Sequence, residues 1–462
     1  MLMIKERILE NLESGLRGDL IRPADDAYRQ ARRVYNGMID KRPGAIVSCR
    51  DAGDVMAAIG AARAHGLQLA VRGGGHNGPG LGTCDEGLVV DLSPMRGVRV
   101  DPDARSARVA GGSVWGDVDH ATHAFGLAVP SGIISTTGVG GLTLGGGHGY
   151  LSRKYGLTID NLLSADVALA DGRFVTASED ENSDLFWALR GGGGNFGVVT
   201  SFLFRLHPVE TVYGGPMIWP IEQTAEAMAW YRDFMADAPE DLYGFFAIMT
   251  VPPAPTFPKE LHGRQACGVV WCHLGTSAEA EQQIDKARRF SPPLFEHVGP
   301  VPYPALQSAF DALYPKGLQW YWKGDFIKDL NNAAIQAHVE HGAEMPTPLS
   351  TMHLYPIDGA VHRKRPDETA FHCRDARWSM VIVGVDPDPA NAGAIRDWAR
   401  SYWESLHPYS AGSSYVNFMM EEGADRIRAT YGGNYERLAA AKRKYDPSNL
   451  FCVNQNIAPD GV

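Results

Sequence analysis

The chain places a histidine and an asparagine directly after three consecutive glycines. Residues 71–80 read V-R-G-G-G-H-N-G-P-G, so the glycines are followed by His76 and Asn77. Glycine adopts the backbone conformations that turn successive N–H groups inward, and it lets the chain approach a ligand closely. This stretch therefore predicts a backbone nest for a large, flat, phosphate-bearing cofactor, with an imidazole beside it.

Two further stretches offer the same backbone chemistry. Residues 138–149 contain G-V-G-G and G-G-G-H-G, and residues 191–197 read G-G-G-G-N-F-G. Neither stretch matches the G-x-G-x-x-G pattern that opens nicotinamide-binding folds, which also needs an acid about twenty residues later. The glycines thus indicate a dinucleotide held by another kind of fold.

Composition sets the broad class. The 462 residues are 44% hydrophobic and 21% charged, without an apolar run long enough for a membrane span, which indicates a soluble chain of two or three domains. Lys and Glu interspersed in residues 1–16 predict an amphipathic helix instead of a signal peptide, and hence a cytoplasmic location. The net charge of −11 argues against nucleic acid as a partner. The short basic groups at 363–365 and 442–444 are expected to be solvated surface charges or charges at helix C-termini.

The cysteines follow neither metal-ligand nor disulfide spacing, so we expect buried free thiols and no metal site. They are Cys49, Cys84, Cys267, Cys272, Cys373 and Cys452.

The elements that must position these motifs change in character along the chain. In the first part, short strands are predicted at 45–48, 69–72, 88–92 and 107–110, with a helix from Ala52 to the glycine that ends it, Gly66. The second strand runs straight into the triple glycine.

The middle of the chain is richer in aromatic residues. Longer strands are predicted at 242–251, 268–274, 350–355 and 378–385, with helices at 276–290 and 390–406 and a proline-marked loop near 252–258. This alternation predicts an antiparallel sheet backed by helices. A last helix, 434–444, precedes a tail expected to be extended, in which Asn454 and Asn456 point the same way because a strand repeats every two residues.

In this order the motifs resemble the berberine-bridge-enzyme-like FAD oxidases of the p-cresol methylhydroxylase and vanillyl-alcohol oxidase superfamily, with a layout most similar to the bacterial hydroxynicotine oxidases. The stretches that carry the resemblance are VRGGGHN, GLAVPSGIISTTGVGGLTLGGGHGYLSRKYGLTIDN, LFWALRGGGGNFGVVT and YGGNYERLAAAKRKYDPSNLFCVNQNI. The resemblance implies an α+β fold with two domains. A p-cresol-methylhydroxylase-type FAD-binding domain of two α/β subdomains is expected from 1–208 and 413–462, and an antiparallel-sheet substrate-binding domain backed by helices from 209–412.

The resemblance also implies a covalent cofactor. The histidine of R-G-G-G-H, here His76, is expected to bond to the 8α-methyl of FAD, its neutral imidazole nitrogen adding to the methide form of that methyl. Many relatives carry a second anchor, a cysteine, at the position that Ile134 occupies here, so we expect a single link. In relatives, the residue before Gly138 governs oxygen access to the flavin, and the small Thr137 favours an oxidase.

The remaining FAD contacts are carried over from the family's loops. The expected set is Arg72, Gly73, Gly74, Gly75, His76, Asn77, Ser131, Thr137, Gly138, Gly141, Gly147, Tyr155, Asn161, Gly197, Val198, Asn454 and Asn456.

The substrate side departs from the family pattern. Relatives place a tyrosine or glutamate base in a Y-x-N-Y segment, whereas here Phe418 stands at the position of the base and cannot accept a proton. An alcohol benefits from loss of its hydroxyl proton as hydride leaves, whereas an amine can bind neutral and needs no base, so Phe418 favours an amine or N-heterocycle. Alternative catalytic residues are Tyr415, Tyr321, His353 and His148. The aromatic residues at 320–322 suit a flat pocket.

The function expected from the resemblance is an FAD-dependent oxidase. It would remove hydride from a CH–NH or CH–OH group of a small cyclic or aromatic molecule and reduce O2 to H2O2. A dehydrogenase with another electron acceptor, and a flavin-loaded protein without net redox turnover, are the alternatives. The sequence leaves open the substrate and the oligomeric state, with a homodimer as the alternative to a monomer.

Overall fold

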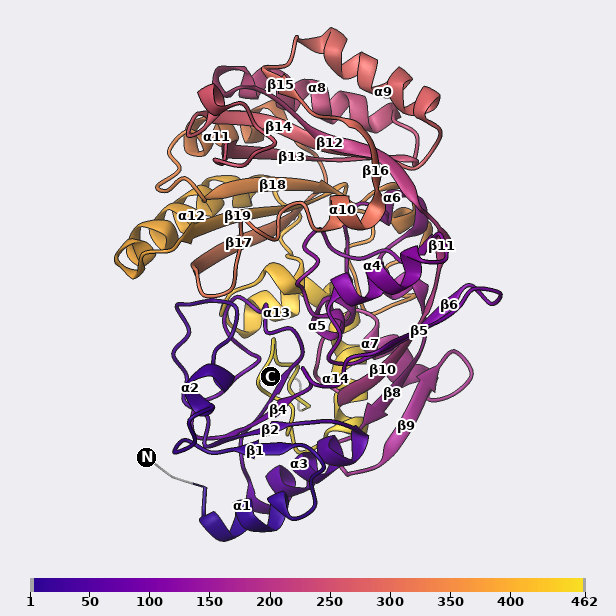
Figure 1. Ribbon diagram of the computed structural model, residues 1–462, viewed down its shortest axis with the longest axis vertical. Coiled ribbons are helices and arrows are strands. Elements are labelled where there is room, and N and C mark those ends of the chain that lie inside the picture. Colours follow the sequence, from indigo (N-terminus) through magenta and orange to yellow (C-terminus); the bar gives the residue numbers. More distant parts are fainter. Residues whose placement is uncertain (1–3, 460–462) are drawn as a thin grey trace.

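The computed structural model describes residues 4–459. Figure 1 shows two parts: a large sheet with its helices forms one end, and two smaller sheets form the other. The chain builds the smaller sheets first and the large sheet next. Its C-terminal segment then returns to the part that contains the N-terminus (Figure 1).

A small mixed sheet begins the fold. Its strands, in spatial order, are β1 (Asp19–Ile21), β2 (Ala45–Ser48), β4 (Leu88–Asp91) and β3 (Leu69–Arg72). β1 is antiparallel to β2, and β4 is parallel to both its neighbours. The helices are α1 (Glu6–Glu13), α2 (Tyr28–Ala31) and α3 (Ala52–His65). The predicted strands and α3 are confirmed, and Gly66 ends α3 at φ 61°.

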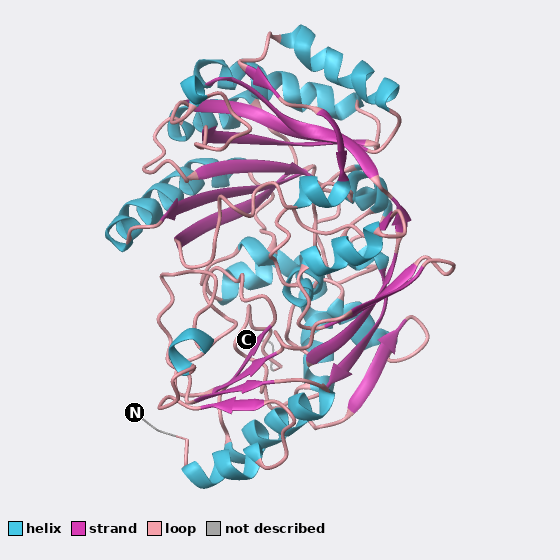
Figure 2. Ribbon diagram, viewed as in Figure 1, coloured by secondary structure: helices cyan, strands magenta, loops and turns pink. Residues whose placement is uncertain are grey.

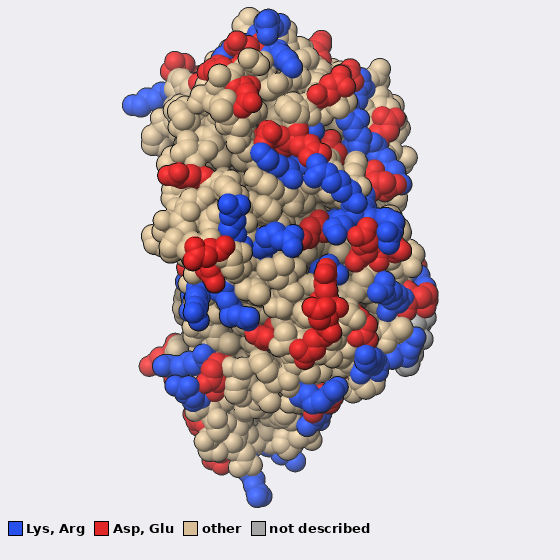
Figure 3. Space-filling model, turned by 90° about the vertical axis from the view of Figure 1, so that its right-hand side faces the viewer, with Lys and Arg blue, Asp and Glu red and all other residues tan. Residues whose placement is uncertain are grey.

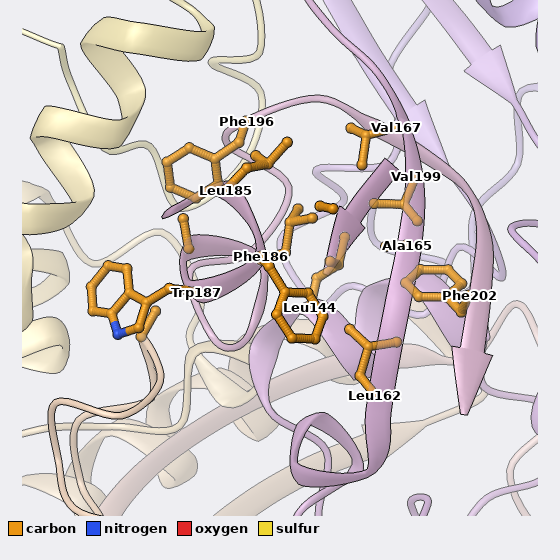
Figure 4. Packing of buried hydrophobic residues seen from close by; sticks show 14 of the residues in the cluster. Leu144, Leu162, Ala165, Val167, Leu185, Phe186, Trp187, Phe196, Val199 and Phe202 are labelled. Atoms are coloured by element: carbon orange, nitrogen blue, oxygen red, sulfur yellow. The ribbon is translucent and has the colours of Figure 1, made fainter. Parts of the chain in front are cut away.

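A second, antiparallel sheet follows. Its strands, in spatial order, are β5 (Val98–Asp101), β6 (Ser106–Ala110), β10 (Val198–Arg205), β8 (Leu162–Ala168) and β9 (Phe174–Ser178). Around it lie β7 (Leu127–Ala128), β11 (His207–Pro208), α4 (Trp115–His123), α5 (Val139–Gly145), α6 (Ser152–Tyr155) and α7 (Ser183–Leu189). Figure 4 shows Leu185 and Phe186 of α7 in one buried cluster with Leu162 and Phe202 of the sheet.

The middle of the chain forms an eight-stranded antiparallel sheet, as predicted. Its strands are β12 (Thr211–Pro220), β13 (Leu242–Thr250), β14 (Gln265–His273), β15 (Phe295–Glu296), β16 (Gly299–Pro302), β17 (Gln319–Ile327), β18 (Thr351–Pro356) and β19 (Trp378–Asp386). Its helices are α8 (Thr224–Asp237), α9 (Ser277–Phe290), α10 (Tyr303–Gln307), α11 (Asn332–Gly342) and α12 (Ala392–Leu406). Thr276 begins α9 with the predicted capping box.

Alternation along the strands gives this sheet two different faces. In β13, Phe246 and Ile248 pack in the cluster that includes the helices, whereas Phe245 and Ala247 pack in the cluster on the opposite face. Successive side chains of a strand point to opposite faces, so one apolar strand serves both clusters. The long helices α8, α9, α11 and α12 pack on the outer face of the sheet (Figure 2), and the inner face, where Tyr303 and Leu306 of α10 pack, is turned toward the smaller sheets.

The C-terminal segment adds α13 (Ala424–Tyr431) and α14 (Tyr435–Tyr445), which confirms the predicted last helix. Lys442 lies in the last turn of α14, as expected for a charge at a helix C-terminus, and it is fully buried instead of solvated. Its Nζ donates to Asp446 Oδ2 at 2.7 Å and to the backbone oxygens of Asn195 (2.8 Å) and Phe451 (3.1 Å). One buried cation therefore fastens the C-terminal tail to the glycine-rich loop at 191–197.

Arg153 ties the two parts of the fold together from the end of α6. Its guanidinium donates to backbone oxygens at the C-terminal end of α8, among them Ala238 and Pro239, and it pairs with Asp358 at 2.6 Å. The last carbonyls of a helix have no partner within the helix, and a cation there is favoured by the helix dipole. Arg153 thus supplies both the missing donors and the charge.

Arg374 and Asp160 form a second tie. Two parallel hydrogen bonds of 2.7 and 2.8 Å join the guanidinium to the carboxylate, and both side chains are almost fully buried. A bidentate pair fixes direction as well as distance.

A third contact between the two parts consists of hydrogen bonds made by Gln307. Gln307 at the end of α10 donates to Ser131 Oγ at 2.6 Å and to Asp119 Oδ2 of α4 at 3.4 Å. Burial raises the pKa of Asp119 to about 7. Gln307 Oε1 has no partner in the protein, so a hydrogen on residue 119 has an acceptor nearby.

Charges on the outer surface are mixed. On the face shown in Figure 3, acidic and basic side chains are interspersed. Within residues 4–459, no helix combines the length and the apolar character that a bilayer span requires. The six cysteines are free, and five of them are buried, as expected.

Removing Asp160 should strongly destabilise the fold. Asp160→Ala leaves the buried guanidinium of Arg374 without its counter-charge, at an expected cost of about 3–5 kcal/mol in the free energy of unfolding. Denaturant unfolding monitored by tryptophan fluorescence measures this change. The control is Asp367→Ala, which removes an exposed pair with Arg365 and should cost less than about 1 kcal/mol. Equal losses in the two variants would contradict the role given to Asp160.

Asp119 should make stability fall with rising pH. Because its folded pKa lies above the value of an unfolded aspartate, the unfolded state releases its proton first, and stability falls between about pH 4 and pH 7. Asp119→Asn cannot ionise and keeps a hydrogen for Gln307. The variant should therefore match the wild type at pH 4 and be more stable by about 1–3 kcal/mol at pH 8. The exposed Asp103→Asn is the control, and a pH-independent difference for Asp119→Asn would refute the assignment.

Candidate functional site

A cavity of 380 Å³ lies between the glycine-rich loops and the inner face of the large sheet. The loops contribute residues from 71–77, 132–144 and 193–199, and the tail contributes residues from 451–455. The opposite wall comes from β17, β18 and β19 and from residues 415–418. Sequence segments that were predicted to hold a cofactor and segments that were predicted to meet a substrate are thus brought to one space.

The triple glycine is explained by a contact between two loops. A Cβ atom on Gly74 would lie 2.4 Å from the backbone nitrogen of Gly138, and a Cβ on Gly138 would lie 2.3 Å from the nitrogen of Gly74. Real Cβ atoms do not approach so closely, so neither position accepts a side chain. Gly75 is required for a different reason, since its φ of 71° is costly for residues with a Cβ.

Arg72 closes the strand that leads into these glycines. It lies directly beside Asp91 at the ends of the parallel strands β3 and β4, and its Nη2 donates to Asp91 Oδ2 at 2.6 Å. Both residues are buried. Arg72 therefore lines the cavity as one member of an ion pair with Asp91.

His76 lies against an aromatic ring and a hydroxyl group. Its ring stacks on that of Tyr35, with 3.9 Å between centroids, and its Nε2 is 3.2 Å from Thr136 Oγ1. Burial lowers the pKa of His76 to about 4. The imidazole is consequently neutral near pH 7, the state in which a ring nitrogen carries a free lone pair.

The tail reaches the cavity through Asn454 but not in the expected way. Residues 453–455 form a bend and none of residues 451–457 lies in a strand, so the two-residue alternation does not apply. Asn454 lines the cavity and donates to the backbone oxygen of Phe451 at 2.8 Å, whereas Asn456 does not line the cavity. The prediction that both side chains point the same way is not supported by this geometry.

The sheet wall is aromatic and comes from alternate positions of its strands. Trp320 and Trp322 of β17 and His353 and Tyr355 of β18 line the cavity. Tyr321, proposed as a catalytic residue, points to the other face and packs with the helix-covered cluster. The aromatic triplet in the sequence thus supplies two cavity residues, and the middle one is excluded from the site by the strand repeat.

Tyr415 is held by two hydrogen-bond donors. Its Oη accepts from the backbone N–H of Gly147 at 2.9 Å and from Asn417 Nδ2 at 2.8 Å. Burial nevertheless raises its pKa to about 12, so the phenol keeps its hydrogen near neutral pH. Asn417 was missed as a positioning residue, although its place in the Y-x-N segment was a usable signal.

Tyr415, Phe418 and His148 form one aromatic group at this wall. Ring centroids of His148 and Tyr415 are 4.6 Å apart, and those of Tyr415 and Phe418 are 4.9 Å apart. His148 Nε2 is 3.1 Å from Ser379 Oγ, and burial lowers the pKa of His148 to about 3. Phe418 fills the predicted position of the base with a ring that cannot accept a proton.

Most of the predicted cofactor residues line the cavity. They are Arg72, Gly73, Gly74, Gly75, His76, Asn77, Thr137, Gly138, Gly141, Gly197, Val198 and Asn454. The residues that do not are Ser131, Gly147, Tyr155, Asn161 and Asn456.

Contacts elsewhere explain these exceptions. Ser131 is fully buried against Gln307. Tyr155 stacks on His207 with 3.9 Å between centroids, and Asn161 Oδ1 lies 2.6 Å from His207 Nε2. These side chains hold the loops in place from behind and do not present polar atoms to the cavity. Gly147 similarly acts through its N–H, which is donated to Tyr415.

Several cavity residues were not found from the sequence. Tyr35 and Tyr314 line the wall next to Trp320, with centroids 5.0 and 5.5 Å from its ring. Asn36 is buried, and its side chain bonds to the backbone of both Gly78 and Trp320. No local motif marks Tyr35, Asn36 or Tyr314, because their roles depend on segments far away in the sequence.

The loops leave the space that a flat dinucleotide needs. A Cβ atom on Gly141 or Gly194 would meet no protein atom within 4 Å, and both residues line the cavity. The backbone is therefore bare toward the cavity at both positions, and His76 and the aromatic wall line the same cavity. This cradle, together with a neutral histidine, fits FAD.

Comparison with known proteins also indicates FAD as the cofactor. Residues 43–178 match the family model described as FAD binding domain, and residues 414–458 match the one described as Berberine and berberine like. An FAD-linked oxidoreductase of Dictyostelium discoideum is 32% identical, with 98% of this chain and 97% of the relative covered.

A hydroxynicotine oxidase is similar in both sequence and structure. The (R)-6-hydroxynicotine oxidase of Paenarthrobacter nicotinovorans is 29% identical, with 96% of this chain and 98% of the relative covered. The crystal structure of 6-hydroxy-D-nicotine oxidase from Arthrobacter nicotinovorans superposes with a TM-score of 0.85 at 28% identity, covering 96% of this chain and 98% of that one. The chain therefore belongs to the berberine-bridge-enzyme-like family of FAD-linked oxidoreductases.

Proposed function

We propose that the protein is an FAD-dependent oxidase that removes hydride from a CH–NH or CH–OH group of a small cyclic or aromatic molecule and passes the electrons to O2, forming H2O2. The observation that carries this proposal is the single cavity in which the glycine cradle and His76 face the aromatic wall of the large sheet. The bound FAD supplies the hydride acceptor. The protein supplies the position of the substrate and excludes bulk water.

We further propose one covalent link, between His76 and the 8α carbon of FAD. When Nε2 of His76 carries the ring hydrogen and donates it to Thr136 Oγ1, Nδ1 keeps the free lone pair that the link requires. Burial keeps this ring neutral near pH 7. Ile134 lines the cavity where many relatives have a second anchor, and none of the six cysteines, all within residues 4–459, lines it. These observations support attachment through the histidine alone.

The choice of a CH–NH group as the hydride donor is supported by the absence of a proton acceptor at the position of the family's base. Phe418 replaces the family's base, and Tyr415 keeps its proton because its pKa is about 12. A neutral amine needs no proton acceptor before it loses hydride, which favours CH–NH over CH–OH. The resemblance to an enzyme named for hydroxynicotine oxidation favours the same choice.

Oxygen as the electron acceptor is supported by Thr137. This small side chain lines the cavity next to the crossing of the loops, at the position that governs oxygen access in relatives. Peroxide measured during turnover distinguishes an oxidase from a dehydrogenase.

The covalent link predicts that flavin survives denaturation. Acid-precipitated wild type should remain yellow, and His76→Ala should release its FAD to the supernatant because no other anchor is present. Peptide mapping of the flavin adduct measures the site, and His123→Ala serves as a control histidine outside the cavity. A colourless wild-type pellet, or a flavin bound to cysteine, would contradict the single histidyl link.

The lining of the cavity predicts that the pH dependence of kcat/KM follows the ionisation of the substrate and not that of an enzyme group. The titratable lining residues are Tyr35, Arg72, His76, His148, Tyr314, His353, Tyr355, Tyr415 and Tyr431. Burial lowers the pKa of the three histidines to about 4 or 3, raises the pKa of Tyr314 and Tyr415 to about 12, and raises the pKa of Tyr35, Tyr355 and Tyr431 well above the usual value of tyrosine. None of these histidines and tyrosines therefore changes charge between about pH 5 and pH 9.

With an amine that releases peroxide, kcat/KM should accordingly rise tenfold per pH unit up to the pKa of the amine itself. With an alcohol, the profile should be flat from pH 5 to pH 9. Steady-state oxygen consumption measures both cases. Repeating the profile with Asp119→Asn removes the one buried carboxylate that titrates near pH 7 behind the loops. An inflection near pH 7 with an alcohol, present in both proteins, would show that an enzyme base exists.

A further inference from the structure

The sheet wall offers the substrate few free polar atoms. Val381 and Val383 are apolar, and the hydroxyl of Thr351 is already donated to the backbone oxygen of Ile248 at 2.9 Å. The indole nitrogens of Trp320 and Trp322 are buried. What remains on this wall is the pair formed by His353 and Tyr355.

His353 and Tyr355 act as one unit because they are two residues apart on β18 and so share a face. His353 Nδ1 lies 2.6 Å from Tyr355 Oη. Within residues 4–459 the phenol oxygen has no second partner, so donation to Nδ1 is the arrangement that gives its hydrogen a protein acceptor. The ring hydrogen of His353 then resides on Nε2. No hydrogen-bond partner of that nitrogen is found among the described residues, and His353 lines the cavity.

The same cavity provides no counter-charge for a charged substrate. Among residues 4–459, Arg72 is the one Lys, Arg, Asp or Glu that lines it, and its guanidinium is paired with Asp91 at the cofactor end. The histidines and tyrosines of the lining stay neutral at physiological pH. Transfer of an unpaired charge into such a site is costly.

The wall itself is a continuous series of rings. From His76 it passes to Tyr35 at 3.9 Å, from Tyr35 to Trp320 at 5.0 Å, and from Trp320 to Trp322 at 5.9 Å between centroids. Aromatic side chains at these separations favour a further ring packed against them. Asn36 holds the series in place through its bonds to the backbone of Trp320 and Gly78.

We infer that the substrate is an uncharged aromatic molecule with a hydrogen-bond acceptor, an oxygen or a ring nitrogen, that takes the Nε2 hydrogen of His353. His353 is thus a specificity-determining donor and not the missing base. This inference rests on the proposed function, because it takes the cavity to be the substrate site of a flavin enzyme. An amine substrate would bind in its neutral form.

Binding probes that cannot be oxidised test the inference without turnover. Acetophenone is an aromatic acceptor without a CH–OH or CH–NH group, ethylbenzene has the same shape without the acceptor, and benzoate and phenyltrimethylammonium carry charge. Calorimetric titration of the FAD-loaded wild type should give the tightest binding for acetophenone. Both charged probes should bind at least about a hundredfold more weakly than acetophenone.

Variants of His353 assign the hydrogen bond. His353→Leu should weaken acetophenone binding about fivefold to twentyfold while changing ethylbenzene binding less than twofold, because only acetophenone uses the donor. His353→Gln keeps an N–H group and should recover most of the affinity. Tyr355→Phe leaves the tautomer of His353 free and should cost acetophenone about twofold to fivefold. Tyr321→Phe, on the opposite face of the sheet, is the matched control and should change neither probe.

The outcomes separate this inference from the proposed function. If wild type is yellow but a charged probe binds more tightly than acetophenone, or no probe binds up to its solubility, the inference is wrong and the proposed function stands. If His353→Leu weakens acetophenone and ethylbenzene equally, His353 has only a packing role and the assignment fails. If purified protein carries no flavin absorption, the proposed function fails first. Should His353→Leu not fold, Tyr355→Phe and His353→Gln carry the same test.

Discussion

The crossing of two backbones at Gly74 and Gly138 is the constraint on which the cavity depends. Because neither position has room for a Cβ atom, the loops approach more closely than side chains would allow. His76 and Thr136 stand next to this crossing, one on each loop, and the approach brings the imidazole within hydrogen-bonding distance of the hydroxyl. The glycines are thus required for the meeting of two protein segments as much as for the approach of a cofactor. The anchor is oriented by the same contact that shapes the cradle.

Buried charges hold the parts of the molecule together and leave the cavity neutral. Arg153, Arg374 and Lys442 do not line the cavity, and each bonds to a segment far away in the sequence. Such groups are expensive to bury unless every hydrogen is bonded, and once bonded they permit one arrangement only. The positions of the large sheet and of the tail are therefore defined by directional bonds. A cavity between rigidly docked parts can then be lined by aromatic rings without supporting charges.

Local signals carried most of what could be predicted. Glycine clusters, short strands and the order of the motifs depend on neighbouring residues, so the fold, the two kinds of sheet and His76 at the cavity followed from the sequence. The errors fall where distant packing decides. Tyr321 belongs to an aromatic triplet, but the pairing of β17 with β19 determines which of the three faces inward. Tyr155 lies inside the second of the quoted family stretches, yet its ring stacks on that of His207 in β11. Lys442 stands in a basic run, and only the tail and loop packed around it reveal that it is buried.

The inner sheet face is where this chain is free to differ from its relatives. Hydrogen bonds between β17, β18 and β19 are made by the backbone, so they persist whichever side chains point into the cavity. Alternate residues of the same strands, among them Ile327, Met352 and Ile382, pack instead in the cluster that includes the helices. The glycine loops have no such freedom, because a side chain at the crossing would separate them. Backbone contact thus limits the loops, whereas alternate positions on three strands form the wall that faces them. The pair of His353 and Tyr355 occupies two such positions.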